Sequence, residues 1–341
     1  MRERQSIWME CAVRLVAVAM VMAVMAPGAR AGEKPITLVL AHSATPDNSL
    51  SLGYDRFAQF VKERSGGRLL IEVHGSGTLA GDQTAVEGVR LGNFDMGSCA
   101  SNLIAPFTDA FYWGDLPYIF DTIESSHKVW GGPIGDELKA RVEKELGLKI
   151  LMYNDTGGGF RTITNNVRPL ITPKDVAGLK LMSTASPLHV AILRAWGANP
   201  TTMPWPEVYN ALQQKIVVGE HLHYVWMYFS KHYEALKYAT EVGALSNVHL
   251  GFIGVKSWGK LPPDLQQVVL TSARDAEAYN NKLDAEKGVE AKQKLLQAGL
   301  QLHTPTPDEM KQWREKAMVV YDEFKDKIPQ DLIRRIREAQ R

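Results

Sequence analysis

A short apolar strand, Ile36-Thr-Leu-Val-Leu-Ala41, opens the stretch of sequence that decides the fold. Residues 49–64 follow with apolar side chains near helical spacing, and Ser65-Gly-Gly67 ends that helix because glycine takes the left-handed cap conformation easily. The pattern then predicts a second strand at Leu69-Leu-Ile-Glu-Val73, a further helix, and a third strand that ends near Gly97. Strands that alternate with helices over short connections indicate parallel strands in a layered α/β fold.

A second α/β block is predicted to begin near Gly157, where the same alternation resumes. Residues 263–297 then form a long helical pattern rich in Ala, Lys, Glu and Gln, and Pro262-Pro263 suits the first turn of a helix. At 1.5 Å per residue this helix is about 50 Å long, which exceeds one small domain. The sequence therefore predicts two three-layer α/β lobes with one long helix that spans both.

The composition is that of an ordinary globular protein. Of the 341 residues, 45% are hydrophobic and 23% are charged, and a length of this size predicts two domains. The formal net charge of +1 argues against a nucleic-acid binder that relies on a basic surface. Two cysteines exclude a disulfide scaffold and a multi-cysteine zinc site.

The first 31 residues have the pattern of a secretory signal peptide. Three arginines among the first 14 residues precede an apolar stretch at 15–26, and Ala29-Arg30-Ala31 has the form of a cleavage site. The apolar stretch is shorter than the span of about 20 residues that a membrane helix needs. Cleavage after Ala31 predicts a periplasmic protein. Four arginines and two glutamates leave with the segment, so 35 basic residues then face 36 acidic ones, a net charge of −1.

Motifs of the common enzyme classes are missing from the sequence, which has no Gly-x-Ser-x-Gly, His-Glu-x-x-His or P-loop pattern. Gly157-Gly158-Gly159 lacks the P-loop lysine and is explained as well by a crossing between domains. His221-Leu-His223 beside Glu220 suggests a metal site, but spacing identifies no third ligand, so polar residues on a cleft-facing strand are the favoured interpretation. No catalytic residue, metal or cofactor is predicted.

Arg161 is the strongest binding candidate that the residues themselves suggest. It follows the glycine-rich turn in a strand-like stretch, and a guanidinium between two domains is a bidentate clamp for a carboxylate. A solvated surface arginine is an equally good reading of this pattern. Aromatic side chains such as Trp205 and Tyr153 offer large contact areas for a ligand, although each also suits an ordinary core.

Several motifs along the chain carry a resemblance to a known family. They include Leu38-Val-Leu-Ala-His-Ser43, Gly77-Thr-Leu-Ala-Gly-Asp82, Asp115-Leu-Pro-Tyr-Ile-Phe120, Gly159-Phe-Arg161 and Met203-Pro-Trp-Pro-Glu-Val-Tyr209. Each is modest alone, and their order after a signal peptide makes the set specific. From Ile36 to about Pro329 the chain resembles the periplasmic solute receptors of tripartite ATP-independent periplasmic (TRAP) transporters.

The resemblance implies a periplasmic-binding-protein-like fold whose two lobes close on a small solute by a hinge motion. Each lobe is then discontinuous, with 32–157 and 247–285 in lobe I and 158–246 and 286–341 in lobe II. The implied protein is a receptor and not an enzyme. It is expected to be a monomer in solution that delivers its solute to the TRAP membrane subunits and binds no nucleic acid.

The resemblance also places residues in the ligand pocket. Arg161 matches a family arginine that contacts the ligand carboxylate, and Trp205 matches an aromatic position that packs on the ligand. The family's more invariant carboxylate arginine is replaced here by Met182, and its usual ligand-binding asparagine by Leu222. The predicted ligand-binding set is completed by His42, Ser43, Asp82, Ser98, Cys99, Tyr153, Ser186 and His221.

Two ligand classes remain open from the sequence. Replacing the second arginine by methionine removes a charge-assisted partner of about 1.5–3 kcal/mol from a carboxylate. One candidate is therefore a monocarboxylate with an apolar or hydroxylated body, held by Arg161. The other is a non-acid such as an amino alcohol or small cation, held by aromatic rings and by Asp82 or Glu220. An exported enzyme or a periplasmic sensory adaptor on the same scaffold is a further alternative.

Overall fold

The computed structural model describes residues 34–341, so the predicted signal peptide and its cleavage site lie outside the described residues. Within them, Ile36–Arg341 forms one unit that is built on two sheets. No helix of the described part is long and apolar enough to cross a membrane.

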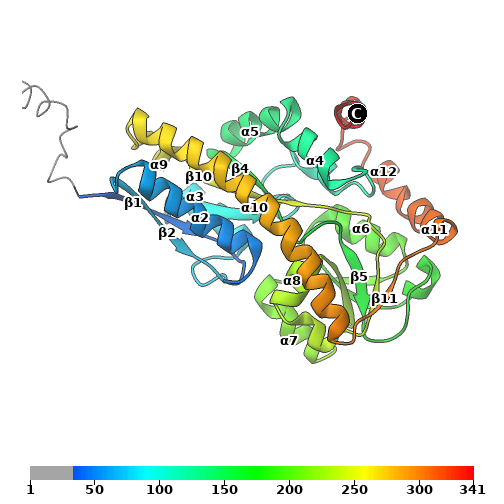
Figure 1. Ribbon diagram of the computed structural model, residues 1–341. Coiled ribbons are helices and arrows are strands. Elements are labelled where there is room, and N and C mark those ends of the chain that lie inside the picture. The colour runs from blue at the N-terminus through cyan, green and yellow to red at the C-terminus, as the bar shows by residue number, and fades with distance from the viewer. Residues whose placement is uncertain (1–33) are drawn as a thin grey trace, which may run out of the picture. The chain divides into compact units, whose positions relative to one another are not determined.

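The first sheet has five strands in the order β2-β1-β3-β10-β4. Figure 1 labels β1, β2, β4 and β10 of this sheet. β1 (Ile36–Ala41) is parallel to β2 (Leu69–His74) and to β3 (Met96–Ala100), as the sequence predicted. β10 (Val248–Gly254) is antiparallel to β3 and to β4 (Leu148–Asp155). A strand from late in the chain thus lies inside the sheet that the N-terminal strands begin.

Local capping explains where the helices of this half begin. Asn48 accepts a hydrogen bond from the amide of Leu50 at the start of the first helix, and Thr122 forms a capping box with Ser125. Pro133 opens the next helix, in the first turn, where its missing N–H is not needed. The helical elements here are α2 (Ser49–Arg64), α3 (Asp82–Leu91), η2 (Tyr112–Asp115), α4 (Ile123–Trp130), α5 (Pro133–Leu146) and α9 (Val255–Gly259).

The second sheet has six strands in the order β11-β9-β5-β8-β6-β7. Its central strand β5 is antiparallel to β8 and β9, whereas β6 is parallel to β7 and β8. The strands are β5 (Thr162–Asn165), β6 (Lys180–Ser183), β7 (Asn199–Thr202), β8 (Gly219–Leu222), β9 (Tyr238–Thr240) and β11 (Gln301–His303).

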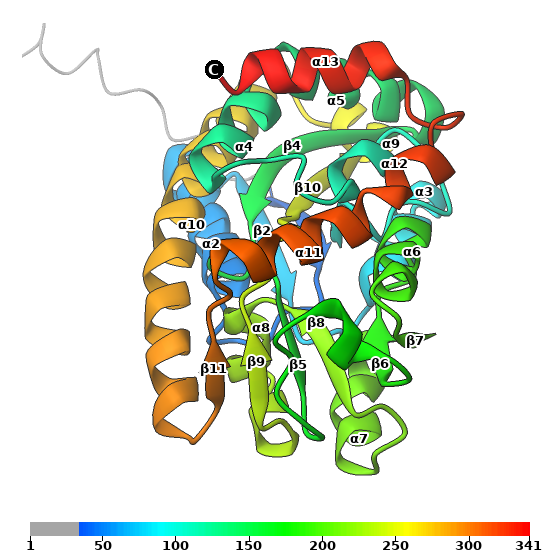
Figure 2. The same ribbon diagram turned by 90° about the vertical axis from the view of Figure 1, so that its right-hand side faces the viewer.

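The helices near the second sheet include the C-terminal ones. The last helix returns to the first half of the fold, because α13 (Gln330–Ala339) packs against α4 (Figure 2). The others are η3 (Pro173–Val176), α6 (Pro187–Ala195), η4 (Trp205–Glu207), α7 (Val208–Gln213), α8 (Tyr224–Phe229), η5 (His232–Ala235), α11 (Pro307–Ala317) and α12 (Val319–Glu323).

α10 (Pro263–Gln297) has the predicted bounds and confirms the prediction of one helix along both blocks. It packs on α2 and β4 of the first half and on α8 of the second half (Figure 1). Its buried residues recur every three or four positions, which is the spacing of one helix face. The buried residues of that face change from apolar to polar at Asn280 and Asp284, and Gly288 follows them. The middle of the face is therefore not built to pack against an apolar core.

Candidate ligand-binding site

A cavity of about 50 Å³ lies between the two sheets. A single water needs roughly 10–15 Å³ on this measure, so the space holds only a few atoms of a ligand. Five of the predicted residues line it: Ser43, Asp82, Arg161, Trp205 and Leu222. The first two come from the half with β1, and the other three from the half with β5. The cavity is therefore closed by residues from both halves of the fold.

Seven other predicted residues lie outside the lining: His42, Ser98, Cys99, Tyr153, Met182, Ser186 and His221. Three of them serve the core. Met182 packs in the apolar cluster of the second half, and Cys99 is fully buried opposite Leu250. Tyr153 donates its hydroxyl to the carbonyl of Gly135, so its polar end points into the first half.

The polar members of that group bond to protein atoms. Ser186 caps α6 and also donates its hydroxyl to Asp115. His221 Nδ1 lies 3.1 Å from His189 Nε2, beneath the second sheet's surface. Both reach the lining through a neighbour, because Asp115 accepts from Asn247 and the His221 carbonyl accepts from Arg161.

The other two members lie just behind the first half's wall. Ser98 Oγ lies 3.2 Å from Nδ1 of His249, so it orients a ring that does line the cavity. His42 Nδ1 accepts a hydrogen bond from the amide of Ala44, and burial lowers the pKa of His42 to about 4. At neutral pH the His42 ring is therefore uncharged.

Arg161 is held rigidly and keeps one nitrogen unused. Its Nε donates to Asn247 Oδ1 at 2.8 Å, and its Nη1 donates to the carbonyl of His221 at 3.1 Å. Asn247 in turn donates to Asp115 at 2.6 Å. The side chain is 4% exposed, and burial lowers its pKa to about 10, so it stays protonated at neutral pH. Within residues 34–341, Nη2 has no hydrogen-bond partner.

Asp82 is the second charged residue of the lining. It begins α3, where the helix N-terminus favours a negative charge. Its Oδ1 accepts a hydrogen bond from the amide of Ala100 at 2.9 Å and lies 3.7 Å from His249 Nδ1. Among the described residues, Oδ2 has no hydrogen-bond partner. One oxygen therefore serves the fold, and the other makes no hydrogen bond within the described chain.

Two imidazoles in the lining are uncharged at neutral pH. Burial lowers the pKa of His223 and that of His249, because a buried ring loses the hydration of its charged form. His249 stacks on the indole of Trp226, with ring centroids 5.5 Å apart and planes 19° apart. His223 Nε2 is buried and has no partner in the part of the chain described. Both rings can offer a neutral hydrogen bond to a ligand.

The remaining polar lining comes from His223, which the sequence placed on a cleft-facing strand, and from residues that sequence reasoning did not select: Asn102, Thr156, Thr184, Asn247 and His249. Asn102 and Thr184 also bridge the two halves, because Asn102 Nδ2 donates to Thr184 Oγ1 at 2.9 Å. One signal was present in the sequence. Asn247 and His249 flank Val248 at the start of a buried strand, and polar residues at the end of such a strand are typical of a binding site.

The interpretation of His221 and His223 as metal ligands has no support in residues 34–341, where no group of three metal-ligating side chains occurs. Glu220 is fully buried and pairs with His232, whose Nδ1 lies 2.9 Å from a carboxylate oxygen. Glu220 is thus satisfied within the protein and is not among the residues that line the cavity.

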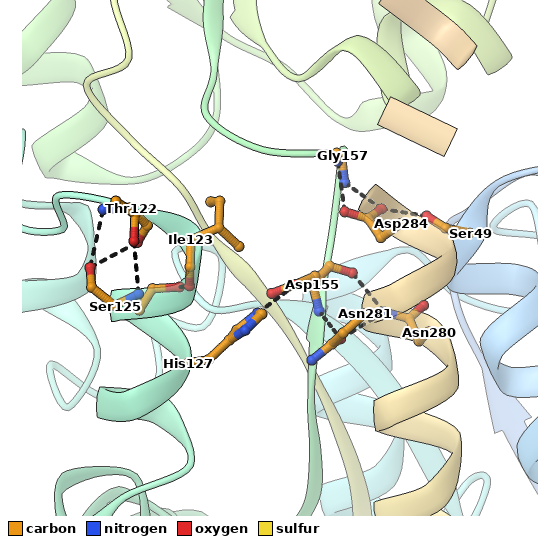
Figure 3. Close-up of polar contacts among 12 residues, drawn as sticks. Ser49, Thr122, Ile123, Ser125, His127, Asp155, Gly157, Asn280, Asn281 and Asp284 are labelled. Carbon is orange, nitrogen blue, oxygen red and sulfur yellow. Dashed lines mark hydrogen bonds and ion pairs between the residues drawn. The ribbon is translucent and has the colours of Figure 1, made fainter. Parts of the chain in front are cut away.

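The segment from Gly157 to Gly159 is the first crossing of the chain from one sheet to the other, and hydrogen bonds hold it on α10 beside the cavity. The amides of Gly157 and Gly158 donate to the carboxylate of Asp284 at 2.9 and 2.6 Å, and Ser49 donates to it at 2.5 Å (Figure 3). Gly158 and Gly288 pack backbone to backbone, since a Cβ built on Gly288 would lie 2.5 Å from Gly158 Cα. Asp155, just before the crossing, bonds to Asn280 and Asn281 of the same helix.

This anchor predicts an unusual pH dependence of stability. Burial raises the pKa of Asp284 from 3.8 to about 6, with Asp155 as a smaller cause, although the three donors oppose the shift. The folded state therefore binds more protons than the unfolded chain between about pH 4 and 6. The contribution of Asp284 to stability is complete below pH 4 and is lost as the pH rises through 6. The loss is on the order of 2–3 kcal/mol.

Urea unfolding of the parent and of Asp284→Asn from pH 4 to 7 measures this contribution. The stability advantage of the parent over the variant is expected to shrink as the pH rises, because the variant does not titrate at this position. An advantage that grows with pH would contradict the raised pKa. Protonation is compatible with the site because the Ser49 hydroxyl can accept as well as donate.

Comparison with known proteins agrees with this architecture. Residues 40–327 match the model of the family described as bacterial extracellular solute-binding protein, family 7. The 2,3-diketo-L-gulonate-binding periplasmic protein of Escherichia coli is 30% identical over 309 residues, which cover 89% of this chain and 92% of that protein. The C4-dicarboxylate-binding periplasmic protein of Rhodobacter capsulatus is 29% identical over 311 residues, 90% of this chain and 91% of that protein.

Solved structures give the same result. A TRAP periplasmic solute-binding protein from Sulfurospirillum deleyianum with bound succinate superposes with a TM-score of 0.85 at 28% identity, covering 90% of this chain and all of that chain. One from Haemophilus influenzae with bound L-gulonate gives 0.84 at 26% identity, covering 89% and 99%. The family consists of binding proteins, so the chain is not an enzyme. The chain belongs to bacterial extracellular solute-binding protein family 7 and is a TRAP periplasmic solute-binding protein.

Proposed function

We propose that this protein captures a small monocarboxylate in the cavity between its sheets and delivers it to the membrane subunits of a TRAP transporter. The observation that carries the proposal is Arg161, a buried and protonated guanidinium whose Nη2 has no protein partner in the described chain. A carboxylate on this nitrogen supplies the charge-assisted hydrogen bond that the buried group lacks. Relatives named for, or solved with, succinate, L-gulonate and diketogulonate support an acidic ligand.

The proposed ligand carries one carboxylate and has a short body. Met182, at the position of the family's second arginine, packs in the core and supplies no second positive charge. Trp205 and Leu222 present apolar surface, whereas Ser43 offers a hydroxyl. The cavity has a volume of about 50 Å³, which favours a short body. An apolar or hydroxylated body therefore fits.

We further propose that the two sheets belong to lobes that move about the crossings, as lobe I (32–157, 247–285) and lobe II (158–246, 286–341). The glycines at 157–159 all have φ between 75° and 129°, a region open to glycine and strained for other residues. Hydrogen bonds between the halves, from Asn102 to Thr184 and from Ser186 to Asp115, hold the closed arrangement. The ligand adds contacts to both lobes and so favours closure.

Export to the periplasm as a monomer completes the proposal. The periplasmic location of the relatives supports cleavage after Ala31. N-terminal sequencing of the protein recovered from a periplasmic fraction is expected to begin at Gly32, and a chain that still begins at Met1 would contradict export by cleavage.

A thermal-shift panel tests the ligand class. Small monocarboxylates are expected to raise the melting temperature, because a ligand at one hundred times its Kd stabilises the folded state by about 2.7 kcal/mol. Dicarboxylates of equal length are expected to do so less, since Arg161 is the one cation among the described lining residues. Stabilisation by amines that lack a carboxylate, with none by any acid, would overturn the proposal.

A further inference from the structure

The charges that line the cavity are balanced. Arg161 is positive and Asp82 is negative, while His223 and His249 are held neutral by burial. The other described lining residues are uncharged. The lining therefore has a net charge of zero at neutral pH, which differs from what a receptor for a simple anion requires.

The two charged groups share the cavity without neutralising each other. No ion pair within 4.0 Å joins Arg161 to a carboxylate in residues 34–341, and Asp82 has no lysine or arginine partner there. His249 lies within electrostatic reach of both, because Asp82 raises its pKa and Arg161 lowers it, against the larger effect of burial. The cavity thus presents a positive end and a negative end with a neutral ring between them.

A ligand with a carboxylate alone pairs with the positive end of this arrangement and leaves the negative end without a partner. Its negative charge on Arg161 would share one small cavity with the buried Asp82 carboxylate. Asp82 is 8% exposed, so little water screens that repulsion. The cost of burying Asp82 itself is offset only in part by the Ala100 amide and the start of α3.

A cationic group at the Asp82 end removes both problems. It forms a charge-assisted contact with Oδ2, which no atom of the described chain occupies. Trp226 lines the cavity, and its indole ring stacks on His249. Nδ1 of the same histidine lies 3.7 Å from Asp82 Oδ1. Trp205 packs on the same indole at near right angles, with ring centroids 5.1 Å apart, so aromatic surface adjoins the Asp82 end.

We propose that the ligand is a small zwitterion, with its carboxylate on Arg161 and a protonated amino or alkylammonium group at Asp82 beside Trp226. This assignment rests on the proposed function, since it keeps the carboxylate on Arg161. It adds the second recognition element and names the class as amino acids and betaines of a few carbons.

Calorimetric titration with matched pairs tests the assignment. The probes are alanine and propionate, 4-aminobutyrate and butyrate, and glycine betaine and 3,3-dimethylbutyrate, which share a carbon skeleton or shape and differ in the cationic group. In at least one pair the zwitterion is expected to bind about 10- to 100-fold more tightly than its partner. Equal binding within every pair that binds would overturn the assignment.

Asp82→Asn and Asp82→Glu provide the matched variants. Asp82→Asn is expected to abolish the preference for the zwitterion. It is also expected to tighten binding of the matched acid that has no cationic group, because the repulsion between its carboxylate and Asp82 disappears. Asp82→Glu keeps the charge and is expected to keep a preference. If Asp82→Asn does not fold, the matched pairs on the parent protein still decide the question.

The outcomes separate the two proposals. Failure of every carboxylate, with or without an amino group, overturns the proposed function. Binding of acids with no preference for the amino group overturns only the zwitterion. Binding of an acid that requires added Na⁺ or Ca²⁺ also overturns it, since a metal ion would then supply the positive charge at Asp82.

Discussion

An Arg161→Met variant is expected to bind carboxylates at least 100-fold more weakly than the parent. The guanidinium makes charge-assisted hydrogen bonds of about 1.5–3 kcal/mol each, and methionine replaces none of them. Methionine fills similar space, so the loss reports charge and hydrogen bonding more than shape. The variant also leaves Asn247 Oδ1 without its donor, and burial already raises the pKa of Asp115. A lower melting temperature without ligand is therefore expected as well.

Two control variants separate binding from folding in this experiment. Arg161→Lys keeps the positive charge and loses the planar fork, so an intermediate affinity is expected. Arg168→Met removes an arginine that bonds to the carbonyls of Asp175 and Ala177, away from the cavity. It is expected to lower stability and leave ligand affinity unchanged. Titration of Arg161→Met with undiminished affinity would place the carboxylate elsewhere.

Gly288→Ala is expected to destabilise the protein by about 3 kcal/mol or more, although alanine normally stabilises a helix interior by about 1 kcal/mol over glycine. The new Cβ would lie 2.5 Å from Gly158 Cα and 2.6 Å from its carbonyl oxygen. Neither backbone can yield cheaply, because Gly158 is tied to Asp284 on the same helix. Moving the crossing away breaks that bond and leaves a buried carboxylate short of donors.

Urea unfolding measures this effect, and Gly259→Ala is its matched control. Gly259 ends α9, and a Cβ there meets nothing within 4 Å. The control is expected to be neutral or slightly stabilising, so the two substitutions should differ in sign. Equal effects at Gly288 and Gly259 would show that the close approach at the crossing is not required for stability.

Much of the fold was predictable because its elements are specified locally. Alternating apolar strands and helices indicated the parallel pairing of β1 with β2 and β3, and Pro263 marked the start of α10. The place of β10 was not predictable in this way. An antiparallel strand between β3 and β4 comes from about 100 residues further along the chain, and no local pattern specifies a partner at that distance.

The candidate site was predictable only in part, for a related reason. A resemblance to a family shows which sequence positions correspond, but the direction of each side chain depends on its neighbours in the fold. Ser186 matched a pocket position, yet its hydroxyl caps α6 and bonds to Asp115. His249 was overlooked because its importance depends on Trp226, Ser98 and Asp82, which reach it from three other segments.

The family, the two-block α/β plan and the long helix could be predicted from the sequence, because periodicity, caps and motif order are carried by neighbouring residues. The character of the pocket could not, because it depends on how distant parts of the chain pack together. Arg161 and Asp82 are 79 positions apart in the chain, and the packing of the two halves brings both to one cavity. A charge acts through space and burial, so its partner and its strength are set by the folded arrangement.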